Sequence, residues 1–157
     1  MIESVYVETS IFSFYHERRK SPAVTAMRDW TRRWWDEHRQ RYDVATSTAV
    51  LAELDSGGLP HRGDALAMAL ALPAIPVQDE IQEIVEVYIV HQVMPKDPVG
   101  DAPHLALASF HKFDYLLTWN CRHLANANKF GHIRRINTLL GLHVPMLVTP
   151  LKLIGGD

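Results

Sequence analysis

The sequence predicts an α/β fold, a three-layer α/β/α domain whose mainly parallel central sheet is covered by helices on both faces. Short apolar runs alternate with longer amphipathic segments along the whole chain, and this alternation is typical of parallel sheets. The runs at residues 4–7 and 115–118 are aromatic, apolar or β-branched, as expected for strands buried on both faces. No linker, repeat or low-complexity stretch divides the 157 residues, so we expect residues 1–157 to form a single domain.

Composition and charge limit the class of protein. Charged residues make up 22% of the chain and the net charge is −2, so nucleic-acid binding would need local basic patches. The chain has one cysteine, Cys121, which cannot form an internal disulfide. The N-terminus lacks the basic and apolar regions of a signal peptide, and no run is long enough to cross a bilayer. We therefore expect a cytoplasmic protein with no membrane contact.

The first strand, at residues 4–7, leads into two helices. Thr9 and Ser10 are the residue types that cap a helix N-terminus, so a short helix is expected to follow. Ser21 as N-cap and Pro22 at the first helical position predict a second, long helix that runs towards Arg41.

Tryptophans mark the faces of this long helix. Met27, Trp30 and Trp34 share one face by their spacing, which favours core positions for both tryptophans. Trp35 is turned away from that face, and both a core position and a partner surface remain open for it.

Later elements follow the same alternation. Ser47 or Thr48 begins a helix that Gly57 and Gly58 stop, and Asp101 opens another. The other expected elements are strands at 42–47, 73–77, 115–118 and 146–149, and helices at 60–72, 79–93, 121–126 and 130–142.

Polar residues stand where the strands end. Glu8 closes the first strand, Asn120 closes the strand at 115–118, and Glu53 lies on the helix after the second strand. With Asp101 they would form an oxygen-rich pocket, because ligands bind beyond the carboxyl ends of parallel strands. Carboxylates roughly 5 Å apart repel by on the order of 3 kcal/mol per pair. Mg²⁺ or Mn²⁺ would relieve this repulsion, and both prefer oxygen ligands. We interpret His104, three residues after Asp101, as a core or supporting residue rather than a ligand.

Four segments in succession resemble a known family. They are Val5-Tyr6-Val7-Glu8-Thr9-Ser10, Ala52-Glu53-Leu54, Gly100-Asp101-Ala102-Pro103-His104-Leu105-Ala106 and Leu116-Leu117-Thr118-Trp119-Asn120. In order and placement they are similar to the motifs of PIN-domain nucleases, and the nearest group is the VapC-like toxins of bacterial toxin–antitoxin systems. The resemblance extends from residue 5 to about residue 149. It implies a three-layer α/β/α domain, a divalent-metal-dependent ribonuclease, a homodimer and an inhibiting antitoxin partner.

The resemblance also assigns site residues. Glu8, Glu53 and Asp101 match the three acidic positions of the family and Asn120 the fourth, with Glu8 and Asp101 as the metal ligands. The implied mechanism is metal-assisted hydrolysis of an RNA phosphodiester with Mg²⁺ or Mn²⁺, in which Glu53 could orient the water. Thr9, Ser10 and Thr118 could orient the ligands from outside.

Two positions depart from the family pattern. The first acid is usually aspartate, and here it is Glu8, one methylene longer. The fourth is often aspartate, and Asn120 supplies only a neutral carbonyl oxygen and an amide donor. These departures motivate a rival interpretation: a PIN-like module that binds RNA or a protein partner without cleavage.

Other chemistries have less support. The loop Arg18-Arg19-Lys20 and the pair Arg134-Arg135 are candidate phosphate contacts, weighed against ordinary solvated surface. A hydrolase based on Cys121 and His123 lacks an obvious orienting acid. No zinc-binding or nucleotide-binding motif occurs in the chain.

Overall fold

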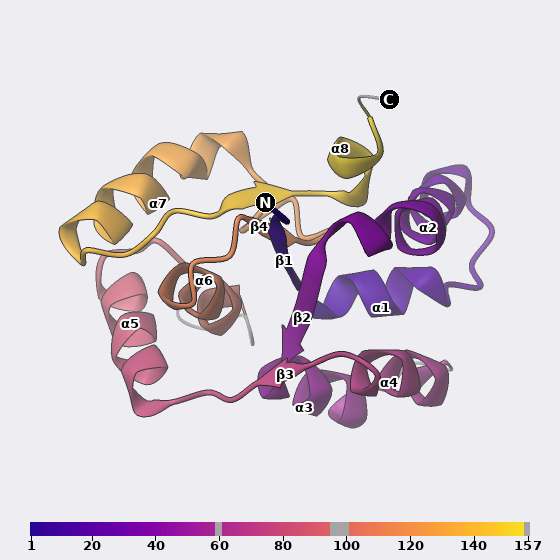
Figure 1. Cartoon of the computed structure of the whole chain (residues 1–157), viewed down its shortest axis with the longest axis horizontal. Helices are drawn as coiled ribbons and strands as arrows, with labels where there is room; N and C mark the ends of the chain where they lie inside the picture. Colours follow the sequence, from indigo (N-terminus) through magenta and orange to yellow (C-terminus); the bar gives the residue numbers. More distant parts are fainter. Residues whose placement is uncertain (59–60, 95–100, 156–157) are drawn as a thin grey trace.

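A computed structural model describes residues 1–58, 61–94 and 101–155. It has a five-stranded sheet, parallel throughout, in the order β3-β2-β1-β4-β5. The predicted three-layer α/β/α fold is confirmed, since helices lie on both sides of this sheet (Figure 1). The strands are β1 (Ser4–Val7), β2 (Asp43–Ser47), β3 (Ala74–Ile75), β4 (Tyr115–Leu117) and β5 (Met146–Val148).

The described residues form eight α-helices. They are α1 (Thr9–Tyr15), α2 (Pro22–Arg33), α3 (Thr48–Ser56), α4 (Arg62–Leu70), α5 (Asp79–Val90), α6 (Asp101–Phe110), α7 (Ala127–Leu139) and α8 (Pro150–Ile154). Figure 1 shows α5, α6 and α7 on one side of the sheet and α1, α2 and α8 on the other. Helices α3 and α4 lie beyond the carboxyl ends of β1 and β2. None of the helices in the described ranges is long and apolar enough to span a membrane.

Strand β1 is the centre of the core. It pairs with β2 on one side and β4 on the other, and Val5, Tyr6 and Val7 are completely buried. Burial on both faces explains why this strand is a continuous run without a charged residue. It also fixes the position of Glu8, which follows directly at the carboxyl edge of the sheet.

The helix predicted to reach Arg41 is interrupted. Helix α2 ends at Arg33, and a π-helical turn (Trp34–His38) and a 3-10 turn (Arg39–Arg41) follow. Trp34 is completely buried and Trp35 is only 8% exposed, with its ring 5.7 Å from that of Phe12. The partner-surface interpretation of Trp35 is therefore wrong. The wider π turn changes the angle between successive residues, and both tryptophans enter the core.

The helix predicted at 121–126 does not form. Asn120 Oδ1 accepts hydrogen bonds from the backbone N–H groups of Arg122 and His123, at 3.2 and 3.1 Å. These are the bonds of a helix N-cap, but the Ala125 N–H then bonds to the Asn120 carbonyl oxygen at 2.9 Å and closes a single wide turn. No helix continues before Asn126 caps α7. Two residues named in the sequence interpretation, Pro60 and Gly100, lie outside the described residues.

Candidate functional site

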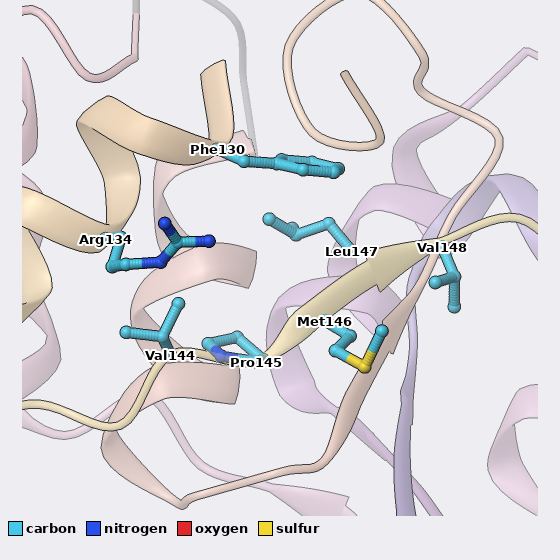
Figure 2. A pocket seen from close by; sticks show the side chains of 7 residues that line it. All are labelled: Phe130, Arg134, Val144, Pro145, Met146, Leu147 and Val148. Atoms are coloured by element: carbon cyan, nitrogen blue, oxygen red, sulfur yellow. The ribbon is translucent and has the colours of Figure 1, made fainter. Parts of the chain in front are cut away.

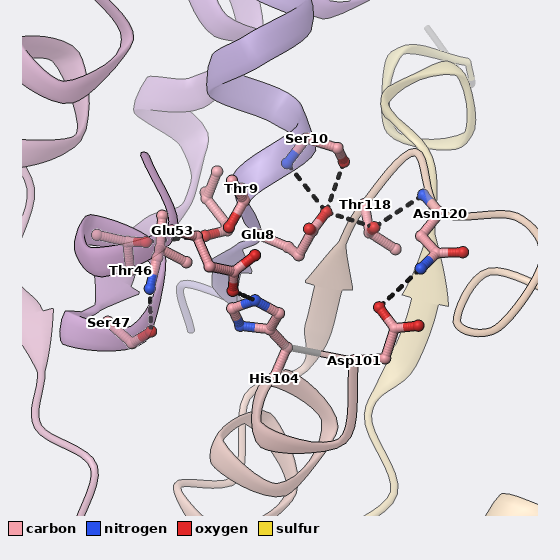
Figure 3. A network of polar contacts seen from close by, with 12 residues as sticks. Glu8, Thr9, Ser10, Thr46, Ser47, Glu53, Asp101, His104, Thr118 and Asn120 are labelled. Carbon is pink, nitrogen blue, oxygen red and sulfur yellow. Dashed lines mark hydrogen bonds and ion pairs between the residues drawn. The ribbon is translucent and has the colours of Figure 1, made fainter. Parts of the chain in front are cut away.

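Glu8 stands at the junction of β1 and α1, where it is held by three donors (Figure 3). Its Oε1 accepts from the Ser10 N–H at 3.2 Å, from Ser10 Oγ at 2.5 Å and from Thr118 Oγ1 at 2.6 Å. Glu8 itself is thus the N-cap of α1, and the expectation that Thr9 or Ser10 fills that position is wrong. A carboxylate at a helix N-terminus is favoured by the helix dipole. The fixed orientation leaves Oε2 outside all three bonds.

Three neighbouring hydroxyls were expected to orient the acids, and the structure shows two of them bonded to Glu8. Ser10 and Thr118 bind Glu8 directly, and Ser10 Oγ also accepts from the Trp119 N–H at 2.8 Å. The hydroxyl of Thr9 is buried without a hydrogen-bond partner among the described residues. Glu8 is therefore positioned from both α1 and the loop after β4.

A chain of hydrogen bonds holds Glu53 from the interior of the protein. His104 Nε2 lies 2.5 Å from Glu53 Oε1, His104 Nδ1 lies 2.6 Å from the Tyr6 hydroxyl, and that hydroxyl lies 2.7 Å from Ser47 Oγ. Ser47 also caps α3 by accepting from the Val50 N–H. The chain joins β1, α3 and α6, and it fixes Glu53, whose side chain is 23% exposed, at the mouth of the site.

The protonation of His104 follows from its partners. Burial alone would lower its pKa. The hydrogen bond to Glu53 and the charges of Glu8, Glu53 and Asp101 outweigh burial and raise it. A carboxylate only accepts hydrogen bonds, so His104 Nε2 carries a proton in this arrangement. His104 is therefore a donor that orients Glu53, and it would become a metal ligand only by giving up that bond.

Asp101 begins α6 and is held by Asn120. Asn120 Nδ2 donates to Asp101 Oδ1 at 2.8 Å, while Asp101 Oδ2 is buried without a hydrogen-bond partner in the described structure. Burial raises the pKa of the Asp101 carboxyl, and the charge of Glu8 raises it further. Both ends of the Asn120 amide are thus engaged within the protein, one by Asp101 and the other by backbone N–H groups.

The carboxyl edge of the sheet brings the four predicted site residues into one region (Figure 3). Within it, one ligand atom each of Glu8, Glu53 and His104 lie within 4.8 Å of one another, and this group could hold a metal ion. It is the one such group of three among the described residues. Asp101 is not part of it, but lies one helical turn before His104.

The donor set suits a divalent cation. Two carboxylates within 4.8 Å repel each other, and the partnerless oxygen of Asp101 is a buried acceptor without a donor. A cation would satisfy both conditions. Carboxylate oxygens suit Mg²⁺ or Mn²⁺, and a contribution from imidazole would extend the range to Zn²⁺ and its neighbours.

Tyr6 is a site residue that the sequence interpretation missed. Burial raises its pKa well above the ordinary tyrosine value, so it keeps its proton. The signal was available: a tyrosine in the middle of a strand buried on both faces needs a hydrogen-bond partner for its hydroxyl. The sequence does not identify that partner, because His104 is 98 residues away.

The basic residues considered as phosphate contacts do not gather at the site. Arg19 forms an ion pair with Glu17 at 3.0 Å. Arg134 lies beside Val144 and Pro145, which precede β5, and the three line an apolar pocket of about 300 Å³ (Figure 2). This pocket runs along β5, whose three residues also line it, and none of the four predicted site residues lines it.

The thiol alternative also loses its basis. Cys121 lies in the turn after Asn120 and not at the start of a helix, and burial raises the pKa of its thiol. A reactive cysteine requires the opposite shift.

Two comparisons with known proteins identified no family. Neither a scan against protein-family models nor a search of curated proteins found a match to this chain.

Proposed function

We propose that the protein is a divalent-metal-dependent endoribonuclease that hydrolyses RNA phosphodiester bonds. The observation that carries the proposal is the convergence of Glu8, Glu53 and Asp101 at the carboxyl edge of a parallel sheet, each held through one oxygen by a defined donor. Such a cluster of fixed carboxylates is costly without a cation, and the motifs around it resemble those of PIN-domain nucleases.

In this proposal Glu8 and Asp101 hold a Mg²⁺ or Mn²⁺ ion, with Glu53 beside it. When bound, the ion would lower the pKa of a water molecule and stabilise negative charge on the phosphate. The protein's own contribution is orientation. Ser10 and Thr118 fix Glu8, and Asn120 fixes Asp101.

Glu53 has a different part in the proposed reaction. It is the most exposed of the three acids, and His104 holds its Oε1. Because Oε1 is held, the orientation of the other oxygen, Oε2, is fixed, and Oε2 can accept a hydrogen bond from a water molecule. Glu53 would orient that water for attack on the phosphorus atom and receive its proton at Oε2.

The net charge of the site supports the need for the ion. RNA is a polyanion, and three carboxylates at the proposed point of cleavage would repel it. Asn120, as a neutral amide, reduces this repulsion by one charge relative to an aspartate. A divalent cation bound by the acids would offset their repulsion of the RNA phosphate.

The resemblance to VapC-like toxins also suggests a biological role and partners. The protein would be the toxin of a toxin–antitoxin pair, form a homodimer and bind a cognate antitoxin. Trp35 lies in the core and supplies no dimer surface, so the dimer rests on the resemblance. Light scattering should give about twice the 17.9 kDa chain mass, and a small open reading frame beside the gene should encode the antitoxin.

The deciding experiment is RNA cleavage by purified protein with Mn²⁺, with Mg²⁺ and with EDTA. We expect cleavage only with a divalent ion, and its loss in Asp101→Asn. Glu86→Gln, an exposed acid on α5, is the matched control and should cleave as the wild type does. RNA binding without cleavage, unaffected by EDTA, would overturn the nuclease proposal in favour of a binding module.

A further inference from the structure

Two histidine rings meet away from the acidic site. His16 follows the last residue of α1 and His61 precedes the first residue of α4, and their ring centroids are 6.3 Å apart. His61 is only 4% exposed, and neither of its ring nitrogens has a hydrogen-bond partner among the described residues. His16 Nε2 is buried without a partner as well. Three of the four ring nitrogens at this contact are thus buried and unsatisfied.

Unsatisfied buried nitrogens are uncommon in proteins because each loses its hydrogen bonds to water without replacement. Either imidazole needs one nitrogen as an acceptor when it is neutral. Burial lowers the pKa of His16, and the neighbouring charge of His61 acts in the same direction. The pair therefore places three ring nitrogens without partners in a buried position, and a neutral imidazole nitrogen is the form in which histidine binds metals.

Asp64 supplies a carboxylate close by. It lies three residues after His61 in the first turn of α4, and residues at this spacing share a helix face. The charge of Asp64 acts on His16 and raises its pKa against the effect of burial. The ligand atoms of His16, His61 and Asp64 do not all lie within 4.8 Å of one another, as those of the acidic group do. Asp64 is exposed, and a change of rotamer would bring its carboxylate to an ion between the rings.

We propose that His16 and His61, with Asp64 as the third protein ligand, form a binding site for a transition-metal ion of the Zn²⁺ class. Two imidazoles and one carboxylate suit Zn²⁺, whereas Mg²⁺ and Mn²⁺ prefer oxygen ligands. With Zn–N bonds of about 2.0–2.1 Å, two imidazoles on one ion have ring centroids about 5–6 Å apart. The observed 6.3 Å is close to this separation.

The ion would join α1, which Glu8 caps, to α4, which follows the helix that carries Glu53. Helix α1 packs against α4. A metal clip at the far end of α1 would therefore stabilise this contact without touching Glu8 or Glu53. The site is independent of the proposed nuclease function.

Thermal melts of untagged protein with Zn²⁺ or EDTA test the site. A hundredfold excess of Zn²⁺ over its Kd should raise the wild-type melting midpoint by about 5–11 °C. His61→Phe and His16→Phe should reduce this rise, and should abolish it where the acidic site is also removed by Glu8→Gln/Glu53→Gln. Without metal, His61→Phe should melt no lower than wild type, because phenylalanine brings no unsatisfied nitrogen. His111→Phe is the matched control, since His111 also has a buried partnerless nitrogen but lies against Phe110.

A second background separates this site from the acidic one. In the Glu8→Gln/Glu53→Gln double variant the Zn²⁺ rise should persist, and it should still depend on His61. If the rise disappears in that background, or survives there in both His16→Phe and His61→Phe, Zn²⁺ binds elsewhere and the proposal is wrong. The absence of a rise in the wild type would equally overturn it. If His61→Phe fails to fold, the same measurement on His16→Phe, at a half-buried position, tests the site.

Discussion

Asp101 is the acid whose removal should separate stability from function most clearly. Its Oδ1 has a single donor and its Oδ2 is buried without one, while burial and the charge of Glu8 raise its pKa. In Asp101→Asn, Oδ1 still accepts from Asn120 and the unsatisfied charge is gone. The amide Nδ2 takes the place of the partnerless oxygen and is buried in turn, so the gain is the removal of a buried charge that Glu8 repels, on the order of 1–3 kcal/mol at an effective dielectric of about 20. Without metal, the variant should therefore melt about 2–12 °C above the wild type at pH 7.

The pH dependence of this difference has a definite sign. The pKa of Asp101 in the folded protein lies above its ordinary value of 3.8, so the folded state binds the proton more tightly than the unfolded chain. Lowering the pH through the folded pKa therefore stabilises the wild type relative to the variant. The gap in melting midpoint should be fully present well above the folded pKa and should close below pH 3.8.

Metal should close the gap in stability, and should reverse the order wherever the metal rise exceeds the gap in EDTA. Binding to the native state at a hundredfold excess over Kd adds about 2.7 kcal/mol, which corresponds to about 5–11 °C for a domain of this size. The wild type should show this rise with Mn²⁺, and Asp101→Asn should lose most of it. A general defect in folding would lower the midpoint in both conditions, so only a metal-linked role for Asp101 closes the gap.

The assay is a set of thermal melts with EDTA and with Mn²⁺ between pH 3 and pH 8. Glu86→Gln removes an equal charge from the exposed face of α5 and should follow the wild type throughout. An Asp101→Asn protein that is less stable than wild type in EDTA at pH 7, or that keeps the full Mn²⁺ rise, would refute the placement of this acid in a metal site.

Two further substitutions examine the hydrogen bonds around the acids. Tyr6→Phe leaves His104 Nδ1 buried without its partner, so the free energy of unfolding should fall by about 1–3 kcal/mol; an unchanged urea midpoint would mean that Tyr6 does not support His104. Asn120→Asp replaces the donor 2.8 Å from Asp101 with a second carboxylate, which should lower the melting midpoint in EDTA and enlarge the Mn²⁺ rise. Equal midpoints for Asn120→Asp and wild type in EDTA would contradict this.

Topology made much of the arrangement predictable from sequence. A run such as residues 4–7 has only apolar and small polar members, so it had to be an interior strand. Once the strands are parallel, their carboxyl ends share an edge, and Glu8 and Asn120 must lie there. The expectation for Glu53 followed from the short connection between β2 and α3. The expectation for Asp101, which opens a helix that follows another helix, came from the resemblance to PIN-domain nucleases. These inferences depend on the order of elements and not on their exact packing.

Side-chain partners were much less predictable. The His104–Glu53 bond joins residues 51 apart and the His104–Tyr6 bond residues 98 apart, and periodicity gives the face of an element but not its partner. Local competition caused the other errors. The π turn at Trp34 moved Trp35 into the core, and a wide turn closed by the Ala125 N–H on the Asn120 carbonyl oxygen took the place of the expected helix.

The two departures from the PIN-domain pattern acquire a structural explanation. Glutamate at position 8 reaches back to accept from Ser10 and Thr118, so the same carboxylate caps α1 and faces the site. Asparagine at position 120 donates to Asp101, which an ionised aspartate could not do. Glu8 is thus held by its neighbours and Asp101 by Asn120. Because these contacts also stabilise the fold, through the cap of α1 and the start of α6, they are compatible with a nuclease and with a binding module alike, and the departures alone favour neither.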